Sequence, residues 1–137
     1  MQIEHFAFIL GTLIITNVIA ASALPDKHIS KNFQSTEFAC HHCGEIVIDM
    51  RLIVMLERLR RAIEDRPIII TSGYRCKKHN KAVGGVRNSQ HLLGRAADIK
   101  VVGLSPNDLG ERARAIGLTF VLEYKTWIHV DVREVKK

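Results

Sequence analysis

Two histidines and an aspartate have the types and spacing that suit a bound metal ion. His91 and Asp98 lie seven residues apart, and His129 follows in a later segment. His91 is in a polar turn that ends at a glycine, whereas Asp98 falls within a largely apolar stretch, 96–102, that is typical of the opening of a strand. Three nitrogen and oxygen ligands with one position left open are what a hydrolytic zinc site requires. We therefore expect the loop to fold back over the strand and bring His91 to Asp98.

The third histidine lies in a second predicted strand, residues 127–133. Successive side chains of a strand point to opposite faces. The two faces would carry Trp127, His129, Asp131 and Arg133 on one side and Ile128, Val130 and Val132 on the other. The apolar face would pack on a core, so the polar face is left for solvent or for a site.

These residues are part of a longer ordered set of motifs. The set consists of Ser72-Gly73-Tyr74-Arg75, His79-Asn80, Val83-Gly84-Gly85, Ser89-x-His91-x-x-Gly94-x-Ala96-x-Asp98 and His129-x-Asp131. It resembles the D-alanyl-D-alanine carboxypeptidase and murein endopeptidase family of zinc peptidases, M15, and most closely its small single-domain bacterial and phage branch. The resemblance covers about residues 33–133, nearly all of the chain after its first segment.

The resemblance implies roles for individual residues. His91, Asp98 and His129 would be the zinc ligands, Arg75 would hold substrate and polarise its carbonyl, and Ser89 would line the substrate site. The implied substrate is the stem peptide of peptidoglycan, cut at a D-amino-acid linkage. Whether the cut is terminal or internal stays open.

The chain departs from the family at the catalytic base. The family usually has a glutamate three residues before the last histidine, where this chain has Thr126. Glu123 matches the place of the site glutamate in the related hedgehog signalling domain, and it is favoured because a base must reach the metal-bound water without being a ligand. Asp131 is the other candidate for the base. Alternatively, Asp131 is a carboxylate behind the metal ligands that fixes the tautomer of a histidine. The missing glutamate also keeps open a non-catalytic, zinc-stabilised module that binds cell-wall peptide.

The first segment differs in composition from the rest of the 137 residues, which are ordinary for one globular domain. Residues 6–23 carry no charge and end in Ala21-Ser22-Ala23. This pattern predicts that residues 1–23 are a cleaved signal peptide or a retained membrane anchor, and that residues 24–137 form the peptidase domain. The domain would be exported to the periplasm or the extracellular space.

The charge of the chain is positive. The net charge is +6, and without residues 1–23, which hold one acid and no Lys or Arg, it is +7. Such a field attracts polyanions, including cell-wall polymers, nucleic acid and anionic lipid. Nucleic acid is disfavoured as a partner because the basic residues are scattered and no recognised binding motif is present.

The domain is expected to be a monomer.

The three cysteines allow two interpretations. Export favours a disulfide between Cys76 and either Cys40 or Cys43. The alternative is a second, structural zinc ion bound by Cys40, Cys43, Cys76 and His79, because Cys76-x-x-His79 repeats the spacing of Cys40-x-x-Cys43 and four donors close a tetrahedron.

The predicted elements form an α+β fold. Helices are expected at 49–65, with Asp49 as N-cap, at 76–83, and at 106–116, with Ser105 as N-cap. A buried strand at 68–71 would deliver Arg75 to the site, and 118–123 with 127–133 would form a hairpin. Helices would pack on a small, mostly antiparallel sheet of three to four strands, with zinc in a cleft on its open face.

Overall fold

The computed structural model describes residues 27–135. The predicted signal peptide or anchor at 1–23 lies outside these residues. Within 27–135, no helix combines the length and the apolar character needed to cross a membrane.

The expected helices and strands are present, with small differences at their ends. The elements are η1 (Ser35–Phe38), α1 (Met50–Ala62), β1 (Ile68–Ser72), α2 (Lys77–Ala82), η2 (Gln90–Leu93), β2 (Ala96–Val101), α3 (Pro106–Ala115), β3 (Phe120–Glu123) and β4 (Ile128–Asp131). The predicted caps are confirmed, since the side chains of Asp49 and Ser105 accept from backbone N–H groups in the first turns of α1 and α3.

The first long helix is shorter than the sequence suggested. It was expected to reach Asp65 but ends at Ala62, because Glu64 and Asp65 adopt φ values of 61° and 58°. Left-handed backbone cannot continue a right-handed helix.

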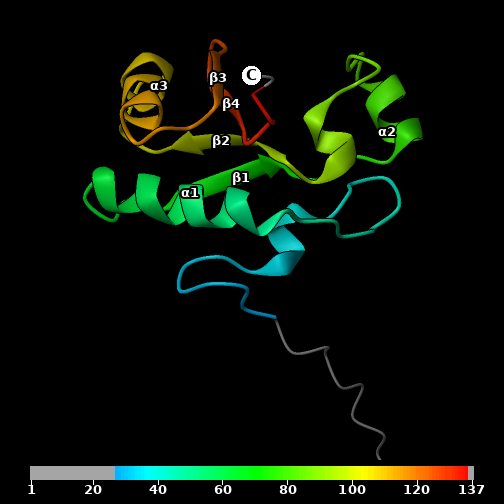
Figure 1. Ribbon diagram of the computed structural model, residues 1–137, viewed down its shortest axis with the longest axis horizontal. Coiled ribbons are helices and arrows are strands. Elements are labelled where there is room, and N and C mark those ends of the chain that lie inside the picture. The colour runs from blue at the N-terminus through cyan, green and yellow to red at the C-terminus, as the bar shows by residue number, and fades with distance from the viewer. Residues whose placement is uncertain (1–26, 136–137) are drawn as a thin grey trace, which may run out of the picture.

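The strands form one antiparallel sheet in the order β1-β2-β4-β3. The α+β architecture is therefore confirmed. In Figure 1, α1 runs along β1, α3 lies beside β3, and α2 lies at the opposite end of the molecule from α3.

One face of the sheet packs on the helices and forms the core. Ile99, Ile128 and Val130 are fully buried there against Leu56 of α1 and Leu109 of α3. Because side chains alternate along a strand, their neighbours Asp98, His129 and Asp131 lie on the other face. The helices therefore hold the strands in place from behind, and the polar face is left for a site.

A glycine ties the loop before β2 to the start of α1. Gly94 has φ 65°, and its carbonyl accepts a hydrogen bond from the N–H of Asp49 at 2.9 Å. A Cβ atom at this position would lie 2.2 Å from the carbonyl oxygen of Val47. The loop that carries His91 can approach α1 this closely only because residue 94 has no side chain.

The first prediction compares two glycines. Gly84 has a similar φ of 70°, but a Cβ there would meet nothing within 4 Å. Gly84→Ala should lower the free energy of unfolding by about 1 kcal/mol, the cost of left-handed backbone. Gly94→Ala should cost about 1–3 kcal/mol more, because the added methyl group overpacks against backbone. Urea denaturation of both variants checks this, and equal losses would show that the contact with Val47 is unimportant.

Candidate metal site

Three predicted ligands meet on the polar face of the sheet. Nε2 of His91 lies 3.2 Å from both Oδ1 of Asp98 and Nδ1 of His129, and Nδ1 of His129 lies 3.0 Å from Oδ1 of Asp98. Asp98 and His129 are register partners on β2 and β4, so their side chains are direct neighbours. His91 comes from η2 and is only 2% exposed.

Hydrogen bonds on the far side of each imidazole fix its tautomer. Nδ1–H of His91 donates to the carbonyl of Gly73 at 2.6 Å, and Nε2–H of His129 donates to the carboxylate of Asp131 at 3.0 Å. Both partners can only accept, so each neutral ring turns its unprotonated nitrogen toward Asp98. Partners of this kind are typical of metal-binding histidines.

The arrangement fits a divalent cation. Two nitrogen lone pairs and a carboxylate oxygen face one another at 3.0–3.2 Å, and such acceptors repel unless a positive charge lies among them. Two imidazoles and a carboxylate form a ligand set found in catalytic zinc sites. His91, Asp98 and His129 would therefore hold zinc with one position open.

Arginine stabilises the ionised form of Asp98. Burial alone would raise the pKa of Asp98, but its contacts with His129, His91 and Arg75 lower it to about 2. The second carboxylate oxygen, Oδ2, is bound by the Arg75 guanidinium. Asp98 is therefore a carboxylate, and ready to bind a metal, throughout the neutral range.

The end of β1 positions Arg75. Its backbone N–H donates to the carbonyl of His91 at 3.1 Å, and its Nε donates to Ser72 Oγ at 2.9 Å. With Nη2 on Asp98, the guanidinium is held beside the candidate ligands. Nη1 has no side-chain partner among residues 27–135, so it is available to a bound molecule.

Asp131 lies behind His129 and is fully buried. Burial would raise its pKa, but hydrogen bonds from Arg133 and His129 lower it to about 2. The same contacts act on His129: burial alone would lower its pKa, and hydrogen bonds to Asp131 and Asp98 raise it instead. Asp131 is thus hydrogen-bonded to His129, as the tautomer-fixing role suggested for it would require.

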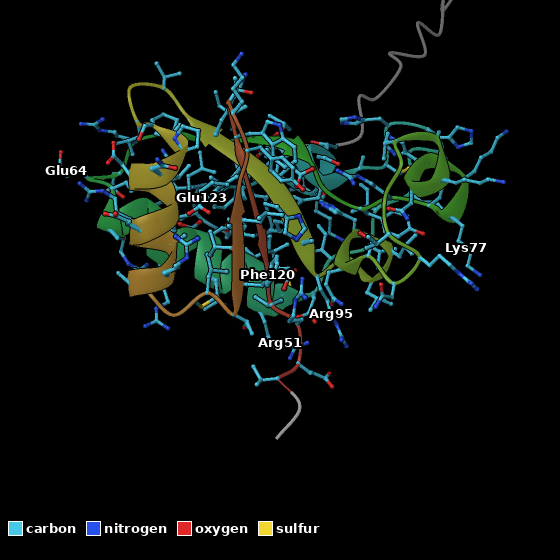
Figure 2. The ribbon with its side chains drawn as sticks, turned by 90° about the horizontal axis from the view of Figure 1, so that it is seen from above. Arg51, Glu64, Lys77, Arg95, Phe120 and Glu123 are labelled. Carbon is cyan, nitrogen blue, oxygen red and sulfur yellow. The ribbon has the colours of Figure 1, made fainter. Side chains whose placement is uncertain are left out.

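The structure does not bring Glu123 to the other site residues. Leu122 is the register partner of His129, so Glu123, one residue further, points to the opposite face. Its carboxylate pairs with Arg114 of α3 at 2.5 Å, and Figure 2 shows it beside that helix. The register of the β3–β4 hairpin therefore turns Glu123, the favoured candidate for the base, away from the candidate ligands.

Ser89 has a structural contact at the site. Its Oγ accepts a hydrogen bond from the N–H of His91 at 3.3 Å, which caps η2. The side chain is nearly buried and lines the same cleft as the three candidate ligands.

That cleft has a volume of about 380 Å³ and an aromatic wall that the sequence analysis missed. The rings of Tyr124 and Trp127 stack at 3.8 Å in the turn between β3 and β4, and both line the cleft. Arg133 lines it as well, with its guanidinium 3.7 Å from the centre of the Phe120 ring. The alternation of residues 127–133 had placed Trp127 and Arg133 on the site face, which was the available signal.

All three cysteines, each within the described residues, are free thiols. The disulfide that the sequence favoured is not formed. The sulfur atoms of Cys40, Cys43 and Cys76 instead lie within 4.8 Å of one another.

The chain is similar in sequence to known proteins. The family model described as Peptidase M15 matches residues 28–131. The chain is also 37% identical, over 67 residues, to a protein of Streptomyces albus G named zinc D-Ala-D-Ala carboxypeptidase. That alignment covers 49% of this chain and 26% of the relative, so the chain spans about a quarter of the relative's length.

The second prediction concerns the carboxylate behind His129. Asp131→Asn should weaken zinc binding about 10- to 100-fold, because the amide holds the ring of His129 less firmly and makes its nitrogen less basic. Competition with a chromogenic chelator measures the affinity. Glu123→Gln is the matched control and should bind zinc like the wild type. A weaker site in Glu123→Gln, or no change in Asp131→Asn, would contradict the placement of these two carboxylates.

Proposed function

The chain belongs to the peptidase M15 family, and on this premise we propose that it is a zinc-dependent peptidase that cleaves D-amino-acid-containing stem peptides or cross-links of peptidoglycan. Membership confirms the resemblance found in the motifs. The observation that carries the proposal is the convergence of two tautomer-fixed histidines and Asp98 at the base of a cleft.

The proposed ligands are His91, Asp98 and His129. A zinc ion bound there would lower the pKa of its bound water and polarise the scissile carbonyl. The remaining chemistry is assigned to the chain's own groups. Gly73 and Asp131 hold the two imidazoles in the tautomers that leave a nitrogen free for metal, and Arg75 keeps Asp98 ionised.

Arg75 and the cleft lining are proposed to bind substrate. Nη1 of Arg75 is proposed to bind either a peptide carboxylate or the oxyanion that develops at the cleaved carbonyl, for which a planar guanidinium is suited. Ser89 has a hydroxyl proton to donate, since its oxygen already accepts from His91. The stacked rings of Tyr124 and Trp127 offer an apolar wall for the methyl groups of alanine residues.

The proposed substrate class rests on the name of the relative and on the charge of the chain. A protein named for D-Ala-D-Ala shares 37% identity over about half of this chain. The net charge of +6 attracts anionic polymers of the cell wall. Residues 1–23 are proposed to direct or anchor residues 24–137 outside the cytoplasm, and the domain is proposed to act as a monomer.

One observation favours a second candidate function. Among the residues that line the cleft, Asp98 is the single carboxylate, and its two oxygens face the histidines and Arg75. Glu123 lies on the other face of the sheet, and both oxygens of Asp131 are bonded to Arg133, with one also bonded to His129. Hydrolysis needs a group that accepts the proton of the attacking water. A zinc-stabilised module that binds cell-wall peptide without cutting it needs none.

The third prediction separates the two functions. Purified protein incubated with peptidoglycan sacculi should release D-alanine or cleaved cross-links, identified by mass, and a chelator should stop the release until zinc is restored. Glu123→Gln should retain turnover, since its carboxylate faces α3. Zinc-dependent retention on sacculi without any product would favour the binding module instead.

The fourth prediction tests Arg75. Arg75→Lys keeps the charge but loses the fork of donors, so kcat/KM should fall about 10²- to 10³-fold. Arg87→Lys is the matched control, because Arg87 is exposed and lies outside the cleft lining; its activity should not change. Zinc content is measured in both variants. If Arg75→Lys loses zinc along with activity, Arg75 acts through Asp98 and not on substrate.

A further inference from the structure

A second group of metal-binding side chains lies outside the cleft. Cys40 and Cys43 come from the turn after η1, and Cys76 is the N-cap residue of α2. Their sulfur atoms lie within 4.8 Å of one another although Cys43 and Cys76 are separated by 33 positions in the chain. Cys40 is buried, Cys76 is half-buried and Cys43 is exposed. None of the three lines the cleft or contributes to the function proposed above.

A histidine lies beside one of the three cysteines. Nδ1 of His79 lies 3.4 Å from Sγ of Cys40. In a tetrahedral site with Zn–S of about 2.3 Å and Zn–N of about 2.0 Å, a sulfur and a nitrogen ligand are about 3.5 Å apart. His79 and Cys40 are therefore already spaced as two ligands of one zinc ion would be.

Backbone groups around the sulfur atoms favour thiolates. The N–H of Cys76 donates to Sγ of Cys40 at 3.4 Å, and the N–H of His79 donates to Sγ of Cys76 at 3.4 Å. Donors of this kind stabilise the ligand form of cysteine.

The closeness of the three sulfur atoms itself points to a cation. They lie within 4.8 Å of one another, so thiolates at these positions would repel. A positive ion bound among them would relieve that repulsion.

We propose that Cys40, Cys43, Cys76 and His79 bind a structural zinc ion that joins the turn after η1 to the start of α2. Four protein donors close the coordination sphere, which distinguishes this site from one that needs an open position. The proposal is independent of the peptidase activity.

The ion would also help to position Arg75. Cys76 follows Arg75 directly, and the N–H of Tyr74, just before it, donates to the carbonyl of Phe38 at 2.9 Å. The segments on either side of Arg75 are thus both tied to residues 38–43, by a backbone hydrogen bond and by the proposed ion. This arrangement would limit how far the guanidinium can move from Asp98.

His42 is the competing fourth donor, since its Nδ1 lies 3.6 Å from Sγ of Cys76. We assign His79 because it contacts the buried Cys40 and its own N–H also binds Cys76, so two of the three sulfur atoms are in contact with it. His42 is exposed. His42→Ala is therefore the matched control for His79→Ala.

The test counts zinc on the full chain by native mass spectrometry, after loading with zinc under reducing conditions. The wild type should carry two ions. Cys43→Ser, at an exposed position, and Cys76→Ser should each carry one, and so should His129→Ala, which removes the cleft ion only. His42→Ala should keep two, whereas His79→Ala should lose the second ion or bind it at least 10-fold more weakly.

A spectroscopic readout identifies which ion is lost. Cobalt in place of zinc should give a thiolate-to-metal charge-transfer band in the wild type and in His129→Ala, and no such band in Cys76→Ser. A wild type purified and measured without reductant that carries one zinc and is two hydrogens lighter would indicate a disulfide and overturn the proposal. Two zinc ions in Cys43→Ser and Cys76→Ser would also overturn it.

Loss of the second ion from His42→Ala and not from His79→Ala would overturn the assignment of the fourth ligand. If only the cleft site fails to bind zinc, the wild type and His129→Ala should carry the same number of zinc ions.

Discussion

The pairing of β2 with β4 is the constraint on which the site depends. Asp98 lies directly opposite His129, so a carboxylate and an imidazole are neighbours before any loop is placed. A register shift of one residue would turn His129 into the core and Val130 into the cleft. The core prevents this, because Ile99, Ile128 and Val130 must stay buried against α1 and α3. Hydrophobic packing behind the sheet therefore sets the geometry of the polar groups in front of it.

The polar face is arranged as two layers of hydrogen bonds. In the inner layer, three acceptors face one another at 3.0–3.2 Å. In the outer layer, Gly73 and Asp131 accept from the histidines, and Arg75 and Arg133 bind the two aspartates. The outer layer orients the two imidazoles and places a positive charge beside Asp98. The geometry of the proposed metal site is thus largely set by groups that would not touch the metal.

Much of this architecture could be predicted from the sequence. Leu52, Leu56 and Leu59 recur at the three- to four-residue spacing of a helix, which predicts α1. The alternation around His129 predicts β4 and its two faces. Glu123 was misplaced because its distance along the chain from His129 was considered without the hairpin register, which pairs Leu122 with His129 and sends Glu123 to α3. The left-handed residues that end α1 at Ala62, and the meeting of Cys76 with the Cys40 turn, depend on tertiary packing that local patterns do not contain.

The central claim is that His91, Asp98 and His129 hold one zinc ion with a coordination position open to the cleft. Anomalous X-ray diffraction at the zinc absorption edge, on crystals of the zinc-loaded protein, locates that ion directly. The account predicts a peak about 2.0–2.2 Å from Nε2 of His91, Oδ1 of Asp98 and Nδ1 of His129, with solvent in the remaining position. A peak away from these three atoms, or a fourth protein ligand filling the open position, would contradict it.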